Sequence, residues 1–161
     1  MATIILLAQT CLTGFLAAWL SLGARDNIFL PAMNGTFTAQ VLGLERLKEE
    51  YPDDYELVKH RRITNPKIQN ALFRLIVVFE TLVCVVLWIG TFWLGLAVLG
   101  LADGASAKPV ALLGALGFTS VWCGFLIGGN HFAYWYCHVD AQNTHYQMAL
   151  WGIGTMIFLC M

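Results

Sequence analysis

The sequence predicts an all-α integral membrane protein, a four-helix bundle whose first loop is helical and amphipathic. The chain is 58% hydrophobic and only 12% charged, whereas soluble domains are nearer 25% charged. Its mean hydropathy is +0.67. Residues 71–102 contain only two charges, Arg74 and Glu80, in an apolar run longer than the ~18 residues that mark a membrane span. A chain of 161 residues with this composition predicts one membrane domain, and the net charge of −1 gives no electrostatic basis for nucleic-acid binding.

Apolar runs place the four spans at about 3–22, 68–101, 110–129 and 143–161. No basic segment precedes the first run, and that run exceeds the ~7–15 apolar residues of a signal peptide, so we expect an uncleaved span. Gly14 and Ala18 form a small-xxx-small pair, which allows another helix to approach closely.

The polar loop, residues 24–67, is expected to begin where Arg25, Asp26 and Asn27 end the first span. Asn34-Gly35 indicates a turn. From there, apolar residues at helical spacing predict a short amphipathic helix on the membrane surface, namely Phe37, Val41, Leu44 and Leu47.

Two further signals divide the rest of this loop. Tyr51-Pro52 is expected to break the surface helix, and Asp53 or Asp54 to cap a second short one. Thr64-Asn65-Pro66 is a helix-start signature, with Thr64 or Asn65 as the N-cap and proline as the first helical residue.

Glu80 is the most unusual residue of the second span. It lies about nine residues inside the apolar run, where an uncompensated carboxylate is expensive. Arg74 is six residues away on a different side of the helix and near enough to the entrance to extend toward lipid headgroups. Glu80 therefore needs a donor on another helix, water in a cavity, or a proton. It either fixes helix packing or serves as a proton relay, ligand contact or partner contact.

The third span is expected to follow a tight loop, Asp103 to Pro109. Gly124 and Gly128 form a GxxxG face on this span. That face is predicted to pack against span two, span four or another subunit.

Aromatic and polar residues mix between Asn130 and His145, and Trp135 lies in a run of aromatic side chains suited to the membrane–water interface. His131, His138 and His145 are spaced by sevens, about 10.5 Å along a helix, which is too far for one metal ion. The five cysteines contain no CxxC pair. We therefore predict structural histidines and thiols, no metal and no cofactor.

Three stretches resemble a known family. Arg62 to Pro66, followed by Glu80 and then Leu87 to Gly90, resembles the second-span signature of the predicted small integral membrane proteins grouped as domain of unknown function 2165. Ile127 to Trp135 is similar to that family's glycine-glycine, aromatic, tryptophan stretch, and the loop after span one is similar as well. The resemblance implies a four-helix, multi-pass protein of the bacterial inner membrane and implies no activity.

Two features depart from the family pattern. Members usually carry an acidic residue where this chain has Asn130-His131. They also carry basic residues before span one and between spans two and three, where this chain has only Lys108. Here seven basic residues lie in loop 24–67, so the positive-inside rule predicts a cytoplasmic loop and external termini; the family's usual charge distribution points the other way.

These observations favour a non-catalytic accessory or stabilising subunit of a larger inner-membrane complex, with respiratory or photosynthetic electron transfer as the favoured setting. Its partners would be the lipid bilayer and other membrane subunits. The alternative is a small oligomeric transporter or channel that uses Glu80 as its proton or ion site. An enzyme is not expected, because HExxH, GxSxG and glycine-rich phosphate-loop motifs are missing. The candidate functional residues are Glu80, Arg74, Asn130, His131, Trp135, Gly124 and Gly128.

Overall fold

The computed structural model describes all of residues 1–161, and every regular element in it is helical. The elements in chain order are α1 (Ala2–Phe29), α2 (Pro31–Gly43), α3 (Glu45–Glu50), α4 (Pro52–Val58), η1 (Lys59–Arg61), α5 (Pro66–Val98), α6 (Gly104–His131) and α7 (Val139–Leu159). Three helices, α1, α5 and α6, are long and apolar enough to cross a membrane. The all-helical prediction is confirmed, whereas the count of four spans is not.

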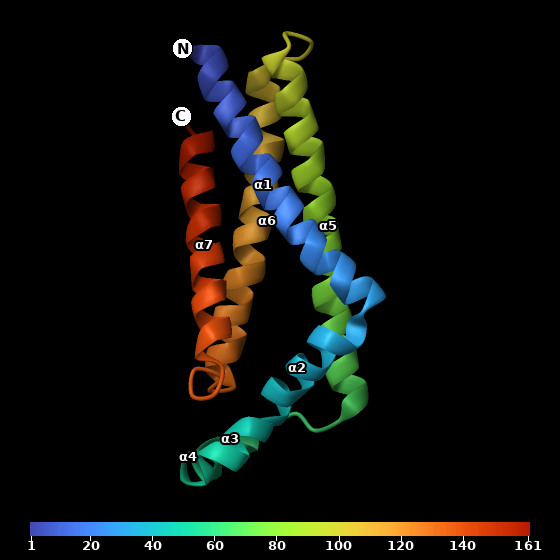
Figure 1. Cartoon of the computed structure of the whole chain (residues 1–161), viewed down its shortest axis with the longest axis vertical. Helices are drawn as coiled ribbons and strands as arrows, with labels where there is room; N and C mark the ends of the chain where they lie inside the picture. The colour runs from blue at the N-terminus through green and yellow to red at the C-terminus, as the bar shows by residue number, and fades with distance from the viewer.

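The long helices run antiparallel in the order α1, α5, α6, α7, with the most extensive contacts between successive members of that row. Both termini lie at one end of the molecule, and α2, α3 and α4 lie at the other end (Figure 1). We call residues 31–61, which contain α2, α3, α4 and η1, the surface cap.

Small residues let the helix backbones approach closely. A Cβ on Gly90 would lie 2.7 Å from the Ala111 Cα atom, so α5 and α6 touch main chain to main chain. A Cβ on Gly14 would lie 3.2 Å from Thr91 Cγ2, so this member of the predicted small-residue pair packs on α5, whereas the other member, Ala18, is exposed. Around these contacts lie the fully buried core side chains, which include Leu16, Ala17, Leu87, Leu94, Ala111, Ala115 and Phe118.

The predicted end of the first span was wrong. Helix α1 continues through Arg25, Asp26 and Asn27 to Phe29, because Arg25 and Asp26 pair with each other on the exposed side at 2.8 Å while Asn27 is buried. The predicted turn at Asn34-Gly35 was also wrong: both residues lie inside α2, which begins at Pro31. Gly35 faces the ring of Phe73 on α5, and this packing holds the segment helical.

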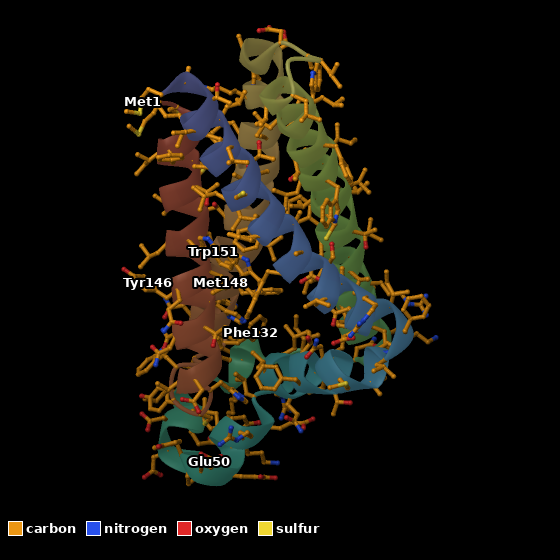
Figure 2. All side chains as sticks on the ribbon, turned by 45° about the horizontal axis from the view of Figure 1, so that its top comes forward. Met1, Glu50, Phe132, Tyr146, Met148 and Trp151 are labelled. Atoms are coloured by element: carbon orange, nitrogen blue, oxygen red, sulfur yellow. The ribbon has the colours of Figure 1, made fainter.

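The surface cap is joined to the rest of the molecule by a second apolar cluster. Leu44 has a left-handed backbone (φ 56°) and separates α2 from α3. Leu44, Leu47, Tyr55 and Ala133 are buried together, so the cap packs on the loop between α6 and α7. Phe132 packs against the same cluster and is labelled in Figure 2.

The helix starts around the cap were predicted in part. Tyr51, and not Asp53 or Asp54, is the N-cap of α4, whose first residue is Pro52. Asn65 is the N-cap of α5, and its side chain accepts a hydrogen bond from the Lys67 amide at 2.9 Å. The Asn65-Pro66 start is therefore confirmed.

The predicted loop 103–109 was wrong, because α6 starts at Gly104. Asp103 is its N-cap and accepts hydrogen bonds from the amides of Ala105 and Ser106, so the polar run is absorbed into the first helical turns with Pro109 inside the helix. Helix α5 ends at Val98, three residues before the predicted boundary at 101, and Gly100 turns the chain with φ 73°.

Helix α7 packs along α6 (Figure 1) but is too polar near its start to count as a span by composition. Asp140, Gln142, Asn143, Thr144, His145 and Gln147 occupy that part. Its apolar part is nevertheless integrated: Gly152 contacts Thr119, and Trp151 points from α7 toward α1 (Figure 2), where its ring meets Trp19 edge-on at 6.2 Å.

Candidate functional site

Glu80 lies on the face of α5 that packs against α1, and only 4% of its surface is exposed. The side chain of Asn27, in the last turn of α1, donates a hydrogen bond from Nδ2 to Glu80 Oε2 at 2.7 Å. The sequence left three possibilities for Glu80, a donor on another helix, water in a cavity or a proton, and Asn27 supplies the first of them.

A second amide extends this contact to the surface cap. Asn34 on α2 donates from Nδ2 to Asn27 Oδ1 at 2.7 Å. We call Glu80, Asn27 and Asn34 the carboxyl–amide triad. It links α5, α1 and α2 through side chains alone, and it brings a carboxyl group into contact with neutral partners. The ion pairs of the molecule lie elsewhere, at exposed positions.

Polar contacts continue for two turns beyond the triad. Cys84 is buried one turn after Glu80. Trp88 then donates from Nε1 to Ser21 Oγ at 3.0 Å, again joining α5 to α1. Further along, Leu16, Leu87 and Leu94 are completely buried. The polar path from the surface cap therefore ends in a packed apolar core.

Arg74 is exposed on α5, and its side chain makes no hydrogen bond or ion pair within the chain. The structure does not bring it to Glu80, in agreement with their six-residue spacing. An exposed arginine near the start of a span is suited to contact lipid headgroups.

Asn130, His131 and Trp135 gather at the far end of α6, separate from the triad. The His131 carbonyl oxygen accepts a hydrogen bond from Arg61 Nη1 at 3.1 Å. Asn130 and Trp135 line a cavity of about 250 Å³ between the α6–α7 loop and the surface cap. Trp135 is 43% exposed, as the predicted interfacial position requires.

Gly124 and Gly128 do not serve a helix contact within the chain. A Cβ added at either position would have no atom within 4 Å, whereas Gly114 and Gly117 of the same helix face Leu87 and Val83 at 3.1 Å or less. Of the predicted partners for this face, spans two and four are excluded within a single chain.

A charged contact holds the cap to the start of α7. Arg46 donates from Nη1 to the Cys137 carbonyl oxygen and lies 3.5 Å from His138 Nδ1. The Phe37 ring meets the His138 ring edge-on at 4.8 Å. Burial, followed by the charge of Arg46, lowers the pKa of His138, so the neutral ring is the form that fits this contact.

Sequence reasoning missed Asn27 and Asn34 as partners of Glu80. One signal was present for Asn27. The buried residues Thr13, Leu16, Leu20, Ala24 and Asn27 follow spacings of three and four along α1, so Asn27 continues the inward face of a helix past its apolar part. No such pattern marks Asn34, because its position depends on the break at Leu30.

A family described as predicted small integral membrane protein (DUF2165) matches residues 5–161. No curated protein and no solved structure matches the chain. Because the family match covers nearly the whole chain, the protein belongs to this family of integral membrane proteins.

Proposed function

We propose that this member of the DUF2165 family is a non-catalytic accessory or stabilising subunit of a larger complex in the bacterial inner membrane, with respiratory or photosynthetic electron transfer as the favoured setting. In this role the protein supplies packed membrane helices and an ordered surface cap, and other subunits carry the chemistry.

The bonding of the buried polar groups supports a structural role. Glu80 is joined to Asn27, and Trp88 to Ser21. Gln9 donates to the Phe158 carbonyl oxygen at 3.0 Å and ties α1 to the end of α7. Each of these contacts holds one helix to another. Such interhelical bonds stabilise membrane bundles by about 0.6 kcal/mol each on average.

The observation that carries the assignment to a larger assembly is the contrast between the glycines of α6. Gly114 and Gly117 allow close packing on α5, while Gly124 and Gly128 face outward with open space around them. A helical glycine costs about 0.5–1 kcal/mol relative to alanine. If a helix of another subunit docks on this face, the close backbone contact that glycine allows would offset this loss of helix stability.

We further propose that α7 is the fourth span, because it packs along α6 and places Leu150, Ile153 and Ile157 on its outer side. The basic residues of the surface cap then favour a cytoplasmic cap and external termini. A reporter protein fused after Met161 tests this arrangement. If the C-terminus is external, a fusion to a periplasmic phosphatase should be active and a fusion to green fluorescent protein should not fluoresce. The reverse result would contradict this arrangement.

The assembly is tested by extraction of the tagged native protein in mild detergent, complex-resolving electrophoresis and an absorbance scan. We expect a high-mass band that contains other membrane subunits. Gly124→Leu should release the chain from that band, whereas Gly154→Leu, an equally open glycine on α7, should leave it in place. A wild-type protein that runs only as a monomer or homo-oligomer would refute the proposal.

The carboxyl–amide triad favours a second candidate function, a small oligomeric transporter with Glu80 as its proton or ion site. The supporting observation is that two amides connect a buried carboxyl to the surface cap. Its test is proton and cation flux in reconstituted vesicles. Glu80→Gln should reduce the flux at least tenfold, with Arg74→Gln as a control on the same helix; unchanged flux in Glu80→Gln would remove this candidate.

A further inference from the structure

The cavity between the surface cap and the α6–α7 loop is lined, like many ligand sites, by apolar side chains with a few polar ones among them. It is open on one side and has a volume of about 250 Å³, with Leu57, Val58 and Trp135 as apolar lining and Asp54, Arg61 and Asn130 as polar lining. Sites for drug-sized molecules run from about 300 to 1,000 Å³. The volume therefore suits a small polar group.

The two charged residues of the cavity each retain free bonding capacity. Arg61 uses Nη1 on the His131 carbonyl oxygen, which leaves its other guanidinium N–H groups available. Asp54 accepts from the Tyr136 hydroxyl at Oδ1, at 3.0 Å, which leaves Oδ2 available. Arg61 and Asp54 are not paired with each other, since the ion pairs of the chain involve other residues. The cavity thus presents one cation and one anion, held apart.

The cavity lies at the depth of lipid headgroups. The apolar run of α6 from Val110 to Gly129 is about 30 Å long at 1.5 Å per residue, which matches the hydrocarbon core of a bilayer. Asn130, which lines the cavity, directly follows that run. Trp135 lines the cavity from the next loop and is partly exposed, as tryptophan at a membrane interface is.

We propose that this cavity binds the headgroup of an ethanolamine phospholipid. The phosphodiester contacts Arg61, with the Asn130 amide as a second donor, and the primary ammonium contacts Asp54. The glycerol and the first acyl carbons lie against Leu57 and Trp135, whose exposed surfaces border the cavity. A zwitterion matches a site with one charge of each sign, whereas a purely anionic headgroup leaves Asp54 without a cationic partner.

The test is native mass spectrometry of the purified full chain titrated with phosphatidylethanolamine, phosphatidylcholine or phosphatidylglycerol of identical acyl chains. We expect phosphatidylethanolamine to bind roughly tenfold more tightly than the other two, because charge-assisted hydrogen bonds to both Arg61 and Asp54 form only with that headgroup. Equal binding of the three lipids by the wild-type protein would overturn the proposal without recourse to any variant.

Variants assign the two contacts. Arg61→Gln should weaken phosphatidylethanolamine binding roughly tenfold. Asp54→Asn should abolish the preference over phosphatidylcholine, whose quaternary ammonium donates no N–H bond. Lys59→Gln is the matched control, since Lys59 is on the same short helix but is paired with Glu56 at 2.6 Å. An equal loss in Lys59→Gln would show general surface attraction and contradict the site.

Soluble glycerophosphoethanolamine separates a lipid from a free metabolite. It has the same charges and no acyl chains, so it should bind at least roughly tenfold more weakly than the lipid, because the contacts with Leu57 and Trp135 are lost. Equal affinity would show that the cavity recognises a soluble phosphodiester and would overturn the assignment to a lipid.

Discussion

The carboxyl–amide triad allows the role of Glu80 to be measured as a helix-to-helix contact. Asn27 donates to Glu80 and accepts from Asn34. Glu80→Gln retains an oxygen that can accept from Asn27 and removes no ion pair, so we expect the variant to fold with little change in stability. Glu80→Leu retains the volume and removes the acceptor, which leaves the Asn27 Nδ2 group buried without a partner.

The magnitude follows from the burial of the pair. A buried donor left without an acceptor costs about 1–3 kcal/mol, and Glu80 is 4% exposed, so Glu80→Leu should lower the free energy of unfolding by about that amount. Asn27→Leu should cost at least as much, because it removes partners from both Glu80 and Asn34. Interhelical hydrogen bonds in membranes reach a coupling energy of about 1.7 kcal/mol, and we expect the Glu80–Asn27 coupling to fall between about 0.5 and 2 kcal/mol.

The assay is reversible unfolding of the purified protein in mixed micelles, with the wild type, the two leucine variants and the double variant forming a double-mutant cycle. Arg74→Leu is the control on the same helix and should shift stability by no more than about 0.5 kcal/mol, because Arg74 is exposed. A Glu80→Leu protein as stable as the wild type, or a coupling energy of zero, would refute the account of Glu80 as a clamp between α1 and α5.

Three further predictions concern packing, capping and pH. Gly90→Ala should lower the free energy of unfolding by about 1–3 kcal/mol, because its Cβ would lie 2.7 Å from Ala111 Cα, whereas Gly124→Ala should raise it by about 0.5–1 kcal/mol in the isolated chain; the same unfolding assay measures both. Asn65→Ala should lower stability by about 0.5–2 kcal/mol through loss of the cap on α5, with faster hydrogen exchange confined to the first turn of that helix. Because burial and then Arg46 lower the pKa of His138 from its ordinary 6.5, the contribution of the neutral ring is complete above about pH 6.5 and is lost as the pH falls through the lower folded-state pKa. The hydrogen-exchange protection factors of α3, which are corrected for the intrinsic pH dependence of amide exchange, should therefore fall as the pH is lowered. His138→Gln should remove that dependence, and an unchanged pH response in the variant would contradict the prediction.

The sequence correctly predicted those parts of the fold that are determined by residues close together in the chain. The apolar runs located α1, α5 and α6, because removal of apolar side chains from water determines which segments enter a membrane. Asn65-Pro66 predicted the start of α5, because the cap satisfies backbone donors within the same turn. The polar start of α7 weakened the same apolar signal, so the fourth span, expected at 143–161 from its apolar run, stays a prediction.

The parts that sequence reasoning missed depend on contacts between distant residues. Asn34-Gly35 favours a turn locally, yet Pro31 starts a helix and Gly35 packs on Phe73, thirty-eight positions further along the chain. Asp103 to Pro109 has the composition of a loop, yet the Asp103 cap permits α6 to begin at once. For the candidate site, Glu80 was identified because a carboxyl group in an apolar run is energetically expensive. Asn27 was assigned to the polar end of a span because it follows the charged residues Arg25 and Asp26, and its burial depends on packing against α5.

The depth of Glu80 decides how its burial is to be understood. Measured from the start of the apolar run, the residue is well inside a span. In the structure, the contact with Asn27 places it level with the last turn of α1, and Val98, at the end of the same helix near the termini, is about 27 Å away along α5. The close contacts Gly90–Ala111 and Gly117–Val83 bring the apolar run Val110–Gly129 of α6 beside α5. A hydrocarbon core matched to that run begins near Gly90 on α5, and Glu80 then lies about 15 Å inside it. A carboxyl group at that depth depends on the hydrogen bond from the Asn27 amide, which in turn accepts from Asn34. Asn27 therefore compensates a polar group buried within the span, which is why loss of either partner should weaken the contact between α1 and α5.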